Sequence, residues 1–258
     1  MTDLFKRLTL AVAIGATTLA ATAQEKPKTD TPATAKPAQK APAPKESATA
    51  PKPRDEKWMK RHDDLLNQVK QKAGNVDLLM VGDSITDGWR GGGKQVFQKH
   101  YGSMDPLNIG IGGDRTQHVL WRLEHGEVEG ISPKAAVLMI GTNNLGSNTD
   151  DEIAAGVTKI VHTLHEKLPK TKVLLLGIFP RSFKADDPAR ARIKTINQQI
   201  AKLDDGGKTV KYLDIGPKFL EADGTLPKSI MPDALHPNEK GYEIWAEAMG
   251  PTLEEMMK

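Results

Sequence analysis

Residues 76–85 read Val-Asp-Leu-Leu-Met-Val-Gly-Asp-Ser-Ile, a nearly unbroken apolar run that stops at Gly82-Asp83-Ser84. An apolar run without polar alternation is typical of a strand buried on both faces, as in a parallel sheet. Ser84 would then follow the carboxyl end of a buried strand, and open α/β sheets bind their ligands outside that end. The stretch therefore predicts a parallel α/β fold with a serine at its ligand-binding edge.

Four further apolar runs follow along the chain, over residues 107–111, 135–140, 173–178 and 210–213. Between and around them, apolar residues recur at intervals of three and four, which is typical of amphipathic helices. These helical patterns lie within residues 58–69, 153–168, 193–203 and 242–253. The alternation predicts a three-layer α/β sandwich, a flavodoxin-like fold with a parallel five-stranded sheet between helices.

The first fifth of the chain has a different composition. Residues 1–23 carry Lys6 and Arg7, then an apolar stretch, then Ala21-Thr22-Ala23, which is the pattern of a cleavable signal peptide. Residues 24–54 hold seven prolines and no aromatic residue, Leu, Ile or Val. Such a segment cannot bury enough apolar surface to offset the entropy lost on ordering. We therefore expect a signal peptide (1–23), a disordered Pro/Ala/Lys-rich linker (24–54) and one folded domain (55–258). The alternative for residues 1–23 is an uncleaved membrane anchor.

The positive charge of the chain belongs to the same N-terminal fifth. The formal net charge is +3, of which +1 lies in residues 1–23 and +4 in residues 24–54, so residues 55–258 carry −2. The predicted domain therefore gives no electrostatic argument for a nucleic-acid partner. The chain has no cysteine, which excludes disulfides, a cysteine nucleophile and cysteine-rich zinc sites.

An acid and a histidine lie three residues apart in Asp233-Ala234-Leu235-His236-Pro237. A serine hydroxyl becomes a good nucleophile only beside a base, and that base needs an acid to orient it. Among the seven histidines, His236 alone has an acid fixed close by on a Pro-bounded loop. Ser84, His236 and Asp233 are therefore the candidate catalytic residues. The alternative interpretation of Asp-x-x-His is a helix cap, because residues 236–239 also resemble a helix start.

Two Gly- and Asn-rich segments lie between these motifs. Gly112-Gly113 follows the second predicted strand, and Gly141-Thr142-Asn143-Asn144 follows the third. An acyl-transfer intermediate needs fixed donors for its oxyanion. The candidates are the N–H of Ser84, the N–H of Gly113, where the missing Cβ allows close approach, and the side-chain amide of Asn143. Taken alone, each segment would be only a turn or a loop.

The four sequence blocks are Gly82-Asp83-Ser84, Gly113, Asn143 and Asp233-x-x-His236. In order and spacing, they resemble the SGNH (GDSL) hydrolases. Residues 108–123, 141–144 and 176–181 resemble the platelet-activating factor acetylhydrolase catalytic subunits in particular. The resemblance covers about residues 58–257. It implies an SGNH hydrolase fold, a Ser84-His236-Asp233 triad, and an oxyanion hole formed by Ser84, Gly113 and Asn143. Ile85 stands where the family usually has Leu, and Leu235 matches a residue lining a small acyl pocket, so both are candidate pocket residues.

The resemblance thus implies a serine esterase that hydrolyses short-chain esters, above all acetyl esters, through an acyl-enzyme. With the signal peptide we expect a secreted or periplasmic enzyme, without stable membrane insertion, acting on small esters or acetylated carbohydrates. No cofactor or metal is expected, although His162 and His165 have helical i, i+3 spacing. A homodimer is implied because the resembling subunits dimerise. The alternatives are a lysophospholipase or thioesterase, and a non-catalytic carbohydrate-binding module.

Overall fold

The structure is a computed structural model that describes residues 46–258. The predicted signal peptide (1–23) and residues 24–45 of the predicted linker lie outside the described residues. Within residues 46–258, no helix has both the length and the apolar character needed to cross a bilayer.

The centre of the described part is a parallel five-stranded sheet with the order β2-β1-β3-β4-β5. Leu79 of β1 pairs with Leu107 of β2 on one side and with Ala136 of β3 on the other, which places β1 inside the sheet. This is the flavodoxin-like order, and it confirms the predicted fold class. The strands are β1 (Leu78–Gly82), β2 (Pro106–Asn108), β3 (Ala135–Met139), β4 (Lys172–Leu176) and β5 (Val210–Leu213).

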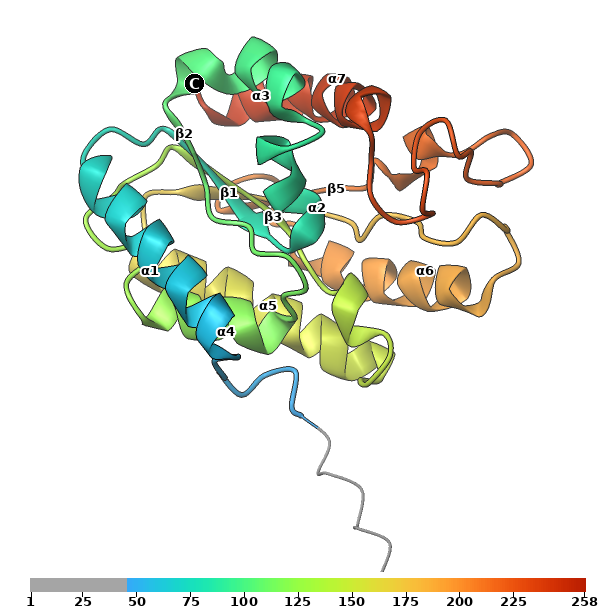
Figure 1. Cartoon of the computed structure of the whole chain (residues 1–258), viewed down its shortest axis with the longest axis horizontal. Helices are drawn as coiled ribbons and strands as arrows, with labels where there is room; N and C mark the ends of the chain where they lie inside the picture. The colour runs from blue at the N-terminus through green and yellow to red at the C-terminus, as the bar shows by residue number, and fades with distance from the viewer. Residues whose placement is uncertain (1–45) are drawn as a thin grey trace, which may run out of the picture. The chain divides into compact units, whose positions relative to one another are not determined.

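Helices cover both faces of the sheet (Figure 1). One face carries α1 (Glu56–Gln71), α4 (Thr116–Glu124), α5 (Asp150–Lys167) and α6 (Pro188–Ile200). The other carries α2 (Ser84–Asp87), α3 (Lys94–Tyr101) and α7 (Glu239–Met256). Short 3₁₀ turns span Gly88–Arg90, Gly102–Met104, Thr142–Asn144, Ala201–Leu203 and Gly216–Phe219. The three layers of the predicted sandwich are therefore present.

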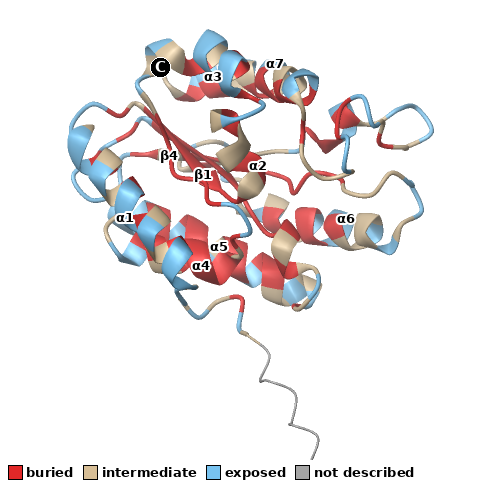
Figure 2. Cartoon of the chain, in the orientation of Figure 1, coloured by how far each residue is buried: buried red, intermediate tan, exposed pale blue. Residues whose placement is uncertain are grey.

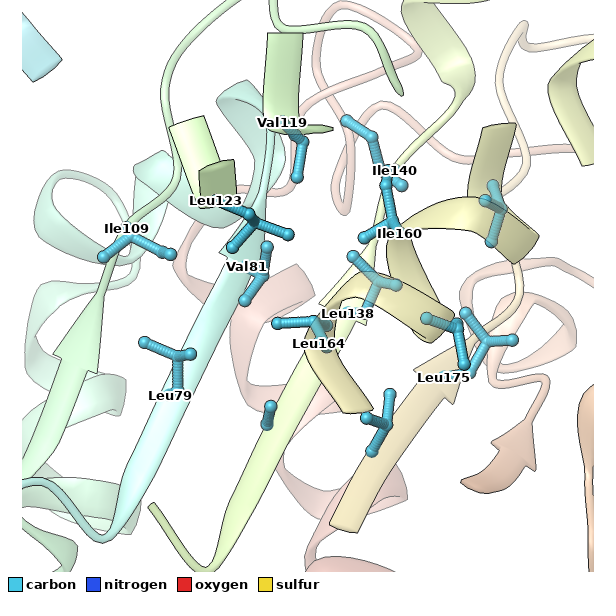
Figure 3. Close-up of a cluster of buried hydrophobic side chains, with 14 of the residues drawn as sticks. Leu79, Val81, Ile109, Val119, Leu123, Leu138, Ile140, Ile160, Leu164 and Leu175 are labelled. Atoms are coloured by element: carbon cyan, nitrogen blue, oxygen red, sulfur yellow. The ribbon is translucent and has the colours of Figure 1, made fainter. Parts of the chain in front are cut away.

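The alternation of side chains along each strand divides the core in two. Leu79 and Val81 of β1 point into the cluster formed with α1, α4, α5 and α6, whereas Leu78 and Met80 point toward α3 and α7. Figure 3 shows part of the first cluster, where Leu138 and Ile160 lie between the sheet and α5. Both faces of the sheet are buried (Figure 2), which explains why the strands are continuously apolar in sequence.

Residues 46–54, which we call the strap, pack against this domain. Ala48 is 1% exposed, and its carbonyl accepts a hydrogen bond from Thr116 Oγ1 at 2.7 Å. The N–H of Lys52 donates to the carbonyl of Gln117 at 3.1 Å. The strap is the blue segment that leads into α1 in Figure 1. For these residues the prediction of a disordered linker is wrong, and the folded part begins before residue 55. Backbone hydrogen bonds and one small buried side chain order the segment, so it needs no apolar run.

Candidate active site

Ser84 is the first residue of α2 and is separated from the end of β1 by Asp83 alone. The turn between strand and helix is tight: a Cβ on Gly82 would lie 2.4 Å from the carbonyl oxygen of Met139, so only glycine fits there. Asp83 caps α2, because its Oδ1 accepts the N–H of Ile85 at 3.0 Å. The sequence therefore folds locally so that Ser84 stands at the carboxyl edge of the sheet, as predicted from the end of the apolar run.

The structure brings Ser84, His236 and Asp233 together across 152 residues of chain. Ser84 Oγ lies 2.8 Å from His236 Nε2, and His236 Nδ1 lies 2.6 Å from Asp233 Oδ2. Burial alone would raise the pKa of Asp233, but hydrogen bonds from the ring and the N–H of His236 hold it below its usual value. An ionised Asp233 accepts the Nδ1–H, and Nε2 is then free to accept the proton of the Ser84 hydroxyl.

The loop that carries Asp233 and His236 is held from two sides. Ala234 has a positive φ of 61° and Ser182, on the loop after β4, has one of 70°. These two strained residues face each other, since the N–H of Ser182 donates to the carbonyl of Ala234 at 3.0 Å. Backbone strain of about 1–3 kcal/mol per residue persists only where surrounding contacts impose it. Beyond the loop, Asn238 caps α7, so the helix start foreseen as an alternative is present as well.

The predicted oxyanion donors converge on the same edge of the sheet. Gly113 has a φ of +77°, and a Cβ on its neighbour Gly112 would lie 3.8 Å from Ser84 Cβ. Asn143 lies in the 3₁₀ turn after β3, and its Nδ2 donates to the carbonyl of Asp114 at 2.9 Å. The second Nδ2 hydrogen makes only a 3.5 Å contact with Asp83 Oδ2.

A buried cluster of charges supports the loop of residues 110–114. Asp114 accepts hydrogen bonds from Trp58 Nε1 at 2.7 Å and from Arg122 Nε at 2.8 Å, and Arg122 also pairs with Glu127. Glu127 in turn contacts His62 Nδ1 at 2.8 Å. Asp114, Arg122 and Glu127 are all 0% exposed. These three ions carry a net charge of −1, and Arg54 adds a positive charge 3.2 Å from Asp114 Oδ1, so each buried ion has a partner of opposite charge.

Sequence reasoning missed this cluster, although one signal was present. Arg122 lies between Val119 and Leu123, which belong to an apolar helical pattern. A charged residue at that spacing falls on the apolar face of the helix, where it needs a buried partner. Asp114 directly follows the Gly112-Gly113 pair. The hint available in the sequence was the pair of opposite charges, Asp114 and Arg122, which lie eight residues apart.

Asp83 is a second buried acid beside the candidate nucleophile. It is 0% exposed, and burial, together with the nearby carboxylate of Asp114, raises its pKa to about 7. The backbone N–H of Ile85 and the charge of His236 act in the opposite direction. Near neutral pH, Asp83 is thus divided between its protonated and ionised forms, unlike Asp233.

Two cavities flank the candidate site. One of about 610 Å³ is lined by Asp233, Leu235 and Arg181 among others. One of about 340 Å³ lies against the start of α1 and is lined by Arg54, Asp87 and Gly112 among others.

Ile85 does not lie at such a cavity. It is 1% exposed in the core beneath α7, and its carbonyl accepts the hydroxyl of Tyr242 at 2.7 Å. The assignment of Ile85 to the substrate pocket is corrected accordingly: one residue past Ser84, the helical turn directs the side chain into the core.

His162 and His165 lie exposed on α5. Residues 46–258 contain no group of three or more His, Cys, Asp or Glu side chains arranged to hold a metal ion.

Comparison with known proteins yields one matching family model, described as the GDSL-like Lipase/Acylhydrolase family, over residues 80–244. Among curated relatives, platelet-activating factor acetylhydrolase IB subunit alpha1 of Bos taurus is 35% identical over 188 residues, which are 73% of this chain and 78% of that protein. The alpha2 subunit of Homo sapiens is 36% identical over 188 residues, covering 73% of this chain and 80% of that protein.

Solved structures share the fold at lower identity. A protein described as a putative platelet activating factor, from Streptococcus pneumonia, superimposes with a TM-score of 0.63 at 23% identity, covering 77% of this chain and 95% of its own. Axe2, an acetylxylan esterase from Geobacillus stearothermophilus, gives a TM-score of 0.56 at 21% identity, covering 72% and 96%. These similarities place the sheet and its helices in a known hydrolase fold.

Proposed function

This chain belongs to the GDSL-like lipase/acylhydrolase family and is a carboxylic ester hydrolase, and from that premise we propose that Ser84, His236 and Asp233 are its catalytic residues. The observation that carries the proposal is the continuous hydrogen-bonded chain from Ser84 Oγ through His236 to Asp233. Family membership supplies the reaction class, and the geometry supports the assignment of roles.

In the proposed mechanism, Ser84 Oγ attacks the carbonyl carbon of the ester while His236 Nε2 takes the hydroxyl proton. Asp233 stabilises the imidazolium that forms. The carbonyl π bond opens, and the N–H groups of Ser84 and Gly113 and the amide of Asn143 donate to the resulting oxyanion. As the carbonyl re-forms, the ester C–O bond breaks and His236 gives its proton to the departing alkoxide.

A water molecule then repeats the sequence on the acyl-enzyme. His236 takes a proton from the water, whose oxygen attacks the acyl carbon, and the bond to Ser84 Oγ breaks as the proton returns to the serine. The carboxylic acid leaves and the enzyme is restored. The net reaction consumes the ester and one water and releases the alcohol and the carboxylic acid.

For the acyl group, the proposal is acetyl. Two kinds of support point this way: the curated relatives are named acetylhydrolases, and Axe2 is named an acetylxylan esterase. Leu235 lines the cavity beside Asp233 and presents an apolar side chain there. The alcohol is proposed to be a carbohydrate.

A second candidate is an acetylated phospholipid of the platelet-activating factor type, favoured by the 35–36% identity to proteins named for that substrate. A lysophospholipase or thioesterase would require a longer acyl groove. Rates on acetate, butyrate and octanoate esters of p-nitrophenol separate short-chain from long-chain hydrolysis. Acetylated xylooligosaccharide and an acetylated ether phospholipid, assayed side by side, separate the two acetyl substrates.

Two further proposals concern the export of the protein and its assembly. The composition of residues 1–23 supports a cleaved signal peptide, and N-terminal sequencing of the mature protein is expected to begin at Gln24. We also propose a homodimer, which light scattering on the purified protein would test. An uncleaved N-terminus or a monomeric mass would reject the respective proposal without affecting the esterase assignment.

A further inference from the structure

Arg54, the last residue of the strap, reaches the loop that carries a proposed oxyanion donor. Its Nη1 donates to the carbonyl oxygen of Gly112 at 2.8 Å and to Asp114 Oδ1 at 3.2 Å. The side chain is 28% exposed; its bond to Asp114 is partly buried, and its bond to the Gly112 carbonyl is exposed. The guanidinium also lies 3.3–3.4 Å from the point where a Cβ on Gly113 would stand, and it therefore covers one side of the loop.

The carbonyl of Gly112 and the N–H of Gly113 belong to the same peptide group. A hydrogen bond accepted by the carbonyl polarises the whole group and strengthens its N–H as a donor, because hydrogen bonds in a chain polarise one another. A charged donor such as guanidinium does this more strongly than a neutral one. Arg54 thus contacts the far end of the same peptide dipole whose N–H faces the oxyanion in the proposed function.

We propose that Arg54 is a positioning residue of the oxyanion hole, which fixes the plane of the Gly112–Gly113 peptide and polarises its N–H. The inference rests on the proposed function of Gly113. It makes the strap part of the catalytic apparatus, in addition to its packing on the domain. Because the N–H acts on charge that develops in the transition state, Arg54 contributes to kcat and little to KM.

The surroundings of Arg54 allow it to be removed without collapse of the loop. Asp114 keeps its hydrogen bonds from Trp58 and Arg122. Lys57 provides a matched control, since it lines the same 340 Å³ cavity with the same charge but makes no hydrogen bond to Gly112. Removing Lys57 therefore changes the charge of the cavity and leaves the peptide group untouched.

The test is steady-state hydrolysis of p-nitrophenyl acetate by the full chain and by Arg54→Ala, Arg54→Lys and Lys57→Ala. The burst of p-nitrophenol counts active sites, and the melting temperature is measured on the same samples. We expect Arg54→Ala to lose about 10-fold in kcat per active site, less than the loss of an entire oxyanion donor. KM should stay within about twofold. Arg54→Lys should recover part of the loss, and Lys57→Ala should match the wild type.

Two results would overturn the inference. A lower melting temperature with wild-type kcat per active site would make Arg54 a structural contact only. An equal effect of Lys57→Ala, or an effect confined to KM, would assign the result to the general charge of the cavity. Failure of the proposed function looks different: the wild type would then show no turnover, or Ser84→Ala would keep it.

Discussion

The two loops that meet at Ser84 are supported in opposite ways. The loop of Asp233 and His236 is largely open to solvent, with side chains 56% and 41% exposed, and short local hydrogen bonds hold it. The loop of residues 110–114 rests on a fully buried set of charges that come from α1, α4 and the turn after α4. The first loop is thus held by local hydrogen bonds and by the bond from Ser182 to Ala234, whereas the second rests on a buried network that includes residues of α1.

This difference separates the proposed chemistry from stability. Changes in the exposed loop should affect turnover and leave unfolding almost unchanged. Changes beneath the other loop should affect both, because an unpaired buried charge destabilises the fold and the loop position. Four substitutions test this contrast.

The largest effect is expected for Asp233→Asn. The amide no longer holds His236 in the tautomer that accepts the serine proton, and a loss of about 10⁴ in kcat should follow. The free energy of unfolding should change by less than about 1 kcal/mol, because the side chain is exposed. Ester hydrolysis and urea unfolding of the same preparation measure both quantities. A fall in stability with near-normal kcat would reverse the roles assigned to the two loops.

Arg122→Met is expected to lower the free energy of unfolding more than the turnover of the folded molecules. It leaves the carboxylates of Asp114 and Glu127 buried without their shared partner, which should cost about 3–5 kcal/mol of unfolding free energy. Residual activity should follow the folded fraction. Leu123→Ala on the same helix serves as a control for simple loss of packing. If Arg122→Met is as stable as the wild type, the buried charges do not hold the loop of residues 110–114 in place.

Asn143→Ala removes one proposed oxyanion donor and leaves the triad in place. One such donor is worth roughly 10²–10³ in kcat, or about 3–4 kcal/mol, with little change in KM. The same side chain also ties the turn after β3 to Asp114, so a modest fall in melting temperature is expected too. A wild-type kcat in the folded fraction would remove Asn143 from the site.

These contrasts show why the sequence revealed one loop better than the other. The apolar run before Ser84 and the Asp-x-x-His motif are local patterns, and the structure has the strand, the turn and the Asp233-His236 contact where they were expected. Trp58 and Arg122 both donate to Asp114, and Arg122 also pairs with Glu127, so the cluster joins segments up to 69 residues apart, and no local pattern specifies it. The order of the strap was not predicted because hydrogen bonds to its backbone hold it on the domain. A search for apolar periodicity does not detect such bonds.

The last of the four substitutions concerns Asp83 and pH. Its folded pKa is raised to about 7 from the ordinary 3.8, so between these values the folded state keeps a proton that the unfolded state has released. Stability contributed by this group is therefore complete below the unfolded pKa and is lost as pH rises through the folded one. The unfolding free energy of the wild type relative to Asp83→Asn should fall by up to about 1.4 kcal/mol per pH unit across this window. Parallel pH dependence in the two proteins would show that Asp83 ionises normally.

The central claim is that Ser84 carries the acyl group, and trapping that group tests it most directly. The protein is mixed with p-nitrophenyl acetate, quenched in acid during the burst, digested, and analysed by mass spectrometry. We predict one acetyl group on the peptide that contains Ser84, absent from Ser84→Ala. It should accumulate further in His236→Ala if that variant is first acetylated with a more reactive ester, because no base then activates water. Acetyl transfer to another residue, or turnover by Ser84→Ala above a tenth of the wild-type rate, would contradict the account.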